Sequence, residues 1–230
     1  MADKNELQQS KISEILGSDI FKGLLPFIGL VIILGVMYWL TNGRIMRPRQ
    51  LRLLLSQVYY PMIVATGVFF VMTLGSIDFT EGSTLGVASI VVSMLSFYSI
   101  PLAIIGGILT GAAIGAVNGF FHVKFRLQSF IVTICTMYLF RGVCAYLTTE
   151  TAIPASAAIK ALDSDNLKIS ITVGVLIIAF FLFKFTRIGN DVKAIGSGET
   201  AARFSGVRTD RVKFLAFVAA GALTGLAAFV

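Results

Sequence analysis

The sequence predicts an all-α fold, a polytopic membrane protein built as a bundle of helices. Of its 230 residues 56% are hydrophobic and only 13% are charged, and the mean hydropathy is +0.86. A soluble domain needs a more polar surface than this composition supplies. The apolar residues are also gathered into runs, several of them about twenty residues long, which is the length of helix that crosses a bilayer. We therefore treat residues 1–230 as a single transmembrane domain.

Seven apolar runs follow one another along the chain, separated by polar or glycine-containing segments. Each predicts a helix, and the seventh stops within apolar residues, so we expect the sequence to be cut short from a longer protein. The runs are Ile20–Leu40, Leu51–Leu74, Thr84–Ile100, Pro101–Val123, Gln128–Leu147, Ile169–Phe185 and Phe214–Val230.

The charged segments between the runs predict a topology. Residues 187–213 are basic and lie against two runs, which the positive-inside rule assigns to the cytoplasm. Counting backward from them puts residues 148–168 outside and the amino-terminal residues 1–19 inside. One conflict remains, because residues 41–52 carry four arginines and this count places them outside. If a run beside residues 75–83 is re-entrant, that first loop lies inside instead.

The segment 187–213 has six basic and three acidic residues. Its middle, Glu199–Ser205, has the pattern of a short helix that Gly206 would end, with Glu199 and Arg203 at the i,i+4 spacing of an ion pair. A cytoplasmic helix held between two membrane helices can act as a lever. The alternative is an ordinary solvated loop with one helical turn.

Glycines recur at helical spacing in two of the predicted helices. Residues spaced by four lie on one face of a helix, where the absence of side chains lets another helix approach closely. That face either slides during transport or simply packs. These packing candidates are Gly107, Gly111, Gly115 and Gly119 in the fourth run, and Gly221 and Gly225 in the seventh.

The stretch GSIDFTEGS, residues 75–83, places Asp78 and Glu81 between two apolar runs. A carboxylate at the centre of a bilayer costs about 3 kcal/mol on insertion scales, so it would face protein or water. The stretch is either a broken helix beside a cavity or an interfacial turn with solvated acids. Asn118 and Arg141 are the other polar candidates for a translocation path. Arg141 has three options, which are to pair with Asp78, to snorkel, or to contact loop carbonyls.

Several function classes are disfavoured by the residues that the chain lacks. It has one histidine, and it contains no phosphate-binding loop, no HExxH motif and no nucleophile elbow. We therefore expect a protein that is not an enzyme, with no catalytic residue, metal site or cofactor. The net charge of +7 comes from residues at the ends of the runs, which favours membrane lipid over nucleic acid as the partner.

Three stretches of the sequence together resemble one family. GSIDFTEGS resembles the G-G-I-D-L-S-V-G-S signature of the sugar-type ABC importer permeases, those similar to the membrane subunit of the ribose transporter. GAAIGAVNGFFHVKFRLQSFIVTICTMYLFRGV resembles that family's fourth-to-fifth span segment. RIGNDVKAIGSGETAARFSGVRTDRVKFLAF resembles its cytoplasmic loop. Against the family pattern, Ser76 replaces a glycine, Glu81 stands where an apolar residue is usual, and residues 197–200 differ.

The resemblance implies a multi-pass subunit of the cell membrane with about ten spans, so that roughly three are absent here. It implies ATP hydrolysis on separate cytoplasmic ABC ATPase subunits, an extracytoplasmic solute-binding protein, and a second permease subunit, identical or related. The cargo would be a sugar or similar small polar solute. The rival function is an ion-coupled secondary transporter or channel that uses Asp78 and Glu81. The residues that would couple to the ATPase are Gly196, Gly198, Glu199, Ala201, Ala202, Arg203, Ser205 and Gly206.

Overall fold

The computed structural model describes residues 19–149, 153–157, 159 and 164–230, and within these ranges the chain is helical with no strand. The predicted cytoplasmic residues 1–18 and part of the predicted external loop 148–168 lie outside the described residues. The chain divides into two compact units, Met1–Leu55 and Ser56–Val230, which we describe separately. The all-α prediction is confirmed for the described residues.

The first unit contains α2 (Asp19–Leu40), the 3-10 helix η1 (Arg44–Met46) and most of α3 (Pro48–Ser56). The Thr41 hydroxyl donates to the Met37 carbonyl at 2.6 Å where α2 ends, and Gly43 turns the chain with φ at 73°. The predicted loop 41–52 is therefore largely helical, since it contains η1 and the first five residues of α3.

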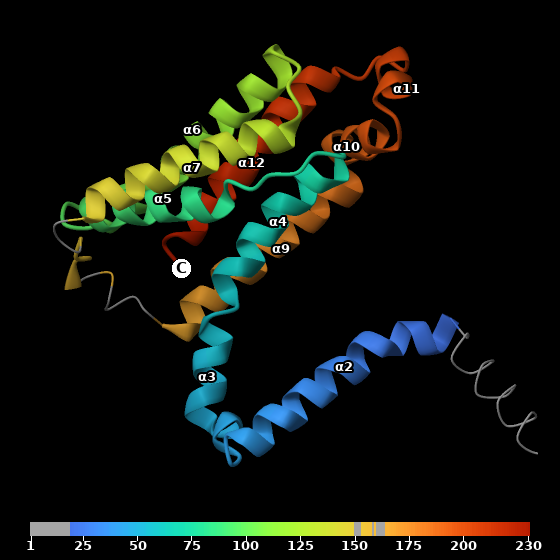
Figure 1. Cartoon of the computed structure of the whole chain (residues 1–230). Coiled ribbons are helices and arrows are strands. Elements are labelled where there is room, and N and C mark those ends of the chain that lie inside the picture. The colour runs from blue at the N-terminus through green and yellow to red at the C-terminus, as the bar shows by residue number, and fades with distance from the viewer. Residues whose placement is uncertain (1–18, 150–152, 158, 160–163) are drawn as a thin grey trace, which may run out of the picture. The chain divides into compact units, whose positions relative to one another are not determined.

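The second unit carries the remaining helices, and Figure 1 shows α4 beside α9 and α12 beside α6. They are α4 (Tyr59–Thr73), α5 (Glu81–Leu95), α6 (Ile100–Lys124), α7 (Ser129–Thr148), α9 (Asp165–Phe185), α10 (Arg187–Ser197), α11 (Glu199–Phe204) and α12 (Thr209–Ala227).

Four helical stretches among the described residues are long and apolar enough to cross a membrane. They are Pro48–Thr73, Ile100–Lys124, Ser129–Thr148 and Asp165–Phe185. Glu81–Leu95 is apolar but shorter, because the stretch that precedes it is extended rather than helical. A membrane bundle is thus supported, while the count of seven spans stays a prediction.

Glycines bring α6 and α12 into backbone contact. A Cβ atom placed on Gly111 would lie 2.0 Å from the carbonyl oxygen of Gly221, and one on Gly107 would lie 2.8 Å from that of Gly225. Gly115 faces the carbonyl of Phe217 in the same way, at 2.2 Å. The two glycine faces found in the sequence are therefore partners of each other, in an antiparallel pair.

The chain between α4 and α5 is extended. Gly75 begins this stretch with φ at 76°, a left-handed conformation that glycine adopts readily, and residues 76–80 then run in Figure 1 from the end of α4 back to the start of α5. We call residues 74–81 the helix break. Asp78 and Thr80 are only 9% and 2% exposed, which argues against an interfacial turn with solvated acids.

Residues 187–213, predicted as a loop with one short helix, contain two helices and the start of a third. The Thr186 hydroxyl caps α10 by accepting from the Gly189 N–H at 3.4 Å. Val192 and Ile195 of α10 are buried against Val71 of α4 and Phe217 of α12. The prediction missed α10 because its two glycines and polar residues resemble a loop, whereas its apolar residues lie on one face and pack.

Basic residues gather at one end of the second unit, which we call the basic end. It comprises the end of α6, the start of α7, α10, α11 and the start of α12, which lie together because α6 and α12 are antiparallel. Its basic residues are Lys124, Arg126, Arg187, Lys193, Arg203, Arg208, Arg211 and Lys213.

Candidate functional site

A chain of hydrogen bonds links the helix break to α6 and α7. The Asp78 carboxylate accepts from the backbone N–H of Thr80 at 2.8 Å and from its hydroxyl at 2.5 Å. The Thr80 hydroxyl oxygen accepts from the Asn118 amide at 2.8 Å, and the Asn118 carbonyl oxygen accepts from the Thr136 hydroxyl at 2.7 Å. Each polar group is therefore satisfied inside the bundle, as buried polar groups must be.

The backbone of the helix break is also bonded to α7. The Ile77 N–H donates to the Ser129 hydroxyl oxygen at 3.1 Å, and the Thr133 hydroxyl donates to the Ile77 carbonyl at 3.4 Å. An extended segment leaves backbone groups without helical partners, and these two side chains supply them. Ser129 and Thr133 are buried, so the conformation of the break is specified by α7.

Glu81, the first residue of α5, reaches a different helix. Its Oε2 atom accepts a hydrogen bond from the hydroxyl of Thr224 in α12. Its Oε1 atom is buried and has no hydrogen-bond partner within the described part of the chain. The break is thus joined to α12 through the Oε2 atom of Glu81, while the Oε1 atom could still accept a hydrogen bond or bind a cation.

The structure brings together three of the four translocation candidates from the sequence. Asp78 and Asn118 share Thr80 as a partner, and Glu81 lies at the same break. Arg141 is exposed on α7, and the hydrogen bonds of Asp78 come from Thr80 rather than from Arg141.

Sequence reasoning missed the three threonines that organise the break: Thr80, Thr136 and Thr224. A usable signal was present, since hydroxyl side chains within apolar helices tend to bond across helices. It was overlooked because threonine is common and uncharged. Thr80 and Thr224 are at most 2% exposed, which distinguishes them from threonines that face lipid.

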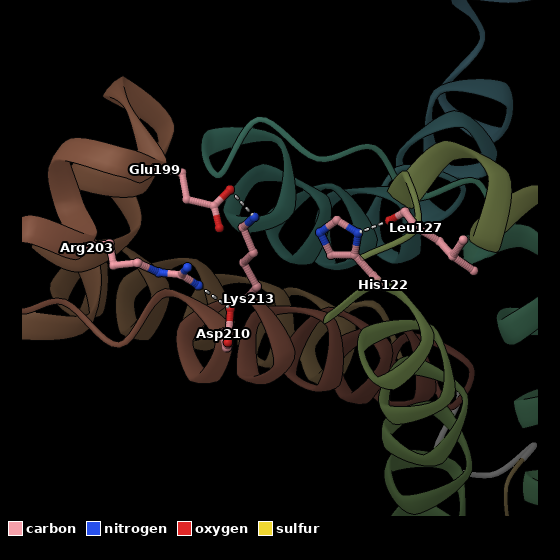
Figure 2. Close-up of polar contacts among 6 residues, drawn as sticks. All are labelled: His122, Leu127, Glu199, Arg203, Asp210 and Lys213. Carbon is pink, nitrogen blue, oxygen red and sulfur yellow. Dashed lines mark hydrogen bonds and ion pairs between the residues drawn. The ribbon is translucent and has the colours of Figure 1, made fainter. Parts of the chain in front are cut away.

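At the basic end, two ion pairs tie α11 to the first turns of α12 (Figure 2). Lys213 Nζ lies 2.6 Å from Glu199 Oε2, and Arg203 lies 3.2 Å from Asp210 Oδ1. The predicted pairing of Glu199 with Arg203 along one helix is therefore wrong, because each residue finds a partner on α12 instead. Both pairs are partly exposed, so each contributes under about 1 kcal/mol to stability, and their main effect is to orient α11.

His122, the single histidine, lies near these pairs at the end of α6 (Figure 2). Its Nδ1–H donates to the Leu127 carbonyl at 2.7 Å, and its ring packs on Phe217 with centroids 5.6 Å apart. The bond holds the turn between α6 and α7. His122 thus has a structural contact beyond the interfacial position that the sequence indicated.

The proposed coupling residues of the basic end divide into inward-facing and outward-facing groups. Ala202 faces inward, since it is 4% exposed and belongs to the apolar core. Gly196 is exposed, but a Cβ added to it would lie 1.9 Å from the Thr73 carbonyl oxygen of α4. Glu199, Ala201, Arg203, Ser205 and Gly206 are exposed, and Gly198 is partly so. Phe204, absent from the sequence-based set, is 88% exposed, the largest value among the exposed large hydrophobic side chains described.

The Glu199–Lys213 pair predicts a small pH dependence of stability. The hydrogen bond and charge of Lys213 lower the pKa of the Glu199 carboxyl, so the pair stabilises the fold near neutral pH and is lost as the pH falls through that lowered pKa. We expect Glu199→Gln to reduce the unfolding temperature slightly at pH 7, and the difference to shrink as the pH falls below the usual range of a glutamate pKa. Thermal unfolding of both proteins across this range measures the difference, and a gap that persists at low pH contradicts the assignment.

A model of the family described as branched-chain amino acid transport system / permease component matches residues 51–230. Similar proteins include the L-arabinose ABC transporter permease of Azospirillum brasilense, 32% identical over 82% of this chain and 58% of that protein. The ribose import permease of Bacillus subtilis is 30% identical over 97% of this chain and 72% of that protein.

The autoinducer 2 import system permease of Enterobacter sp. is 30% identical over 91% of this chain and 62% of that protein. The chain therefore spans 58% to 72% of the length of these relatives. No solved structure matches it.

Proposed function

We propose, from the premise that this chain belongs to the family of permease components of branched-chain amino acid transport systems, that it is a membrane-spanning subunit of an ATP-driven ABC importer. Relatives are named for arabinose and ribose import, so the proposed cargo is a sugar or similar small polar solute. The proposed partners are ABC ATPase subunits at the basic end, a solute-binding protein at the other end, and a second permease subunit.

The observation that carries this proposal is the arrangement of α11. This six-residue helix is oriented by two ion pairs, and it presents Phe204 to solvent at a basic end that the positive-inside rule assigns to the cytoplasm. Aromatic side chains are enriched at protein interfaces, so Phe204 is a suitable anchor for a partner at this end. We propose that Phe204, with Arg203, Ser205 and Gly206, contacts an ATPase subunit.

Removal of the Phe204 side chain tests this contact. We expect Phe204→Ser to weaken co-purification of the ATPase by at least tenfold, because buried aromatic anchors contribute about 2 kcal/mol or more to binding. The measurement is the amount of ATPase retained per permease after affinity purification in detergent. Tyr98→Ser is the matched control, since Tyr98 is 82% exposed in the turn between α5 and α6, at the opposite end. Equal retention by both variants contradicts the proposed contact.

The rival function, ion-coupled transport, is favoured by one observation. Glu81 Oε1 is buried without a hydrogen-bond partner within the described residues, and such a carboxylate in a membrane helix is a candidate for binding a proton or cation. Solute uptake into vesicles that contain only the permease and an imposed ion gradient would favour this function. Uptake that requires the ATPase and ATP favours the importer.

A further inference from the structure

Helix α12 is bonded to both candidate functional regions, which are α11 and the helix break. Near its start, Lys213 and Asp210 are paired with Glu199 and Arg203 of α11. Farther along, Thr224 donates a hydrogen bond to Glu81 at the helix break. Eleven residues separate Lys213 from Thr224, which corresponds to about 16 Å along an α-helix. One continuous helix therefore connects the proposed docking surface to the polar break.

The contact at Thr224 is buried and specific. Thr224 is fully buried, and its hydroxyl is the only donor to the Glu81 carboxylate among the residues that the structure describes. Loss of this donor would leave both carboxylate oxygens without a partner among the described residues, and Oε1 is buried, which is costly in a low-dielectric interior. The Glu81 side chain is therefore strongly directed toward α12.

Close packing makes α12 suited to transmit a displacement. Gly221, three residues before Thr224, is in backbone contact with Gly111 of α6, and a Cβ on Gly67 of α4 would lie 2.9 Å from the Ala220 Cα. Tightly packed interfaces of this kind shift between discrete arrangements instead of deforming continuously. A displacement of α11 would thus be transmitted along α12 to Thr224 with little reduction in its size.

We propose that the Glu81–Thr224 hydrogen bond is the joint through which α12 moves the helix break during transport. Both residues are positioning residues in this inference, which rests on the proposed function. Asp78 and Thr80 lie just before Glu81 in the chain. A displacement of α12 that moves Glu81 therefore also changes the orientation of these two residues.

The test compares variants that remove the hydrogen bond with variants that keep it. Thr224→Val removes the donor with little change in shape, whereas Thr224→Ser retains it. In bilayer discs that contain the permease, the ATPase and the solute-binding protein, we expect Thr224→Val to lower the ratio of solute-stimulated to basal ATP hydrolysis at least fivefold. Thr224→Ser should stay within twofold of the unaltered protein.

A second readout does not depend on the ATPase. Hydrogen exchange of the peptide that covers residues 74–82 should rise about tenfold in Thr224→Val and remain unchanged in Thr224→Ser. A peptide from α9 serves as the internal control for general loosening. If exchange in the break rises only together with exchange in α9, the effect is global and the inference is overturned.

The two readouts separate the inference from the function on which it rests. If the unaltered protein neither retains an ATPase nor shows stimulation, the importer function fails, and the exchange data still decide whether the joint exists. If the unaltered protein is stimulated and Thr224→Val is stimulated equally, the joint is wrong while the importer function stands. Combining Thr224→Val with Glu81→Leu should add no further loss, because both changes remove the same contact.

Discussion

Replacement of Gly111 by alanine is expected to lower the free energy of unfolding by about 3 kcal/mol, at the upper end of the range for overpacked interiors. A Cβ atom there would lie 2.0 Å from the Gly221 carbonyl oxygen and 2.8 Å from the Gly225 nitrogen. Both atoms belong to the backbone and cannot rotate away, so α6 and α12 must separate. Alanine favours a helix over glycine by about 1 kcal/mol, which the steric cost outweighs.

Titration with a denaturing detergent, followed by circular dichroism, measures this change. Gly142→Ala on α7 is the matched control, because no atom lies within 4 Å of its added Cβ, and it should be neutral or slightly stabilising. Gly221→Ala should cost as much as Gly111→Ala, since the Gly111 carbonyl oxygen lies 2.1 Å from its Cβ. Stability of Gly111→Ala equal to that of Gly142→Ala contradicts the close approach.

Most of the helices were predictable because they have a local signal, which is a run of apolar residues. The fourth run, with its regularly spaced glycines, corresponds to α6, which begins at Ile100 after the Ser99 cap. Helix α10 was not predictable in the same way. Its glycines have unfavourable helix propensity, and they are retained because Gly189 and Gly196 lie against carbonyl oxygens of Phe183 and Thr73, contacts that depend on tertiary structure.

The candidate site was predictable in its charged residues and not in its connections. Asp78 and Glu81 stand out in an apolar sequence, because carboxylates are costly there. Their partners Thr80 and Thr224 do not, since a threonine can face lipid or bond to its own helix. Which threonine bonds to which carboxylate depends on how α12 packs, and Thr224 lies 143 residues from Glu81 in the sequence. A pattern within one helix contains no information on that pairing.

The second large effect is expected at Gly196, where α10 meets the end of α4. A Cβ atom on Gly196 would lie 1.9 Å from the Thr73 carbonyl oxygen, so Gly196→Ala should displace the end of α10. Ile195, which is 3% exposed, would lose part of its burial. We expect the local opening free energy of α10 to fall by about 2 kcal/mol, which raises amide exchange over residues 192–197 roughly thirtyfold.

Gly174→Ala on the neighbouring helix α9 is the control, because no atom lies within 4 Å of its added Cβ. Exchange over residues 192–197 should be unchanged in this variant. Thr73 directly precedes the helix break, so Gly196→Ala should also raise exchange over residues 74–82 through its backbone contact with α4. Exchange that rises in α10 alone would show that a displacement of α10 does not reach the break through the end of α4.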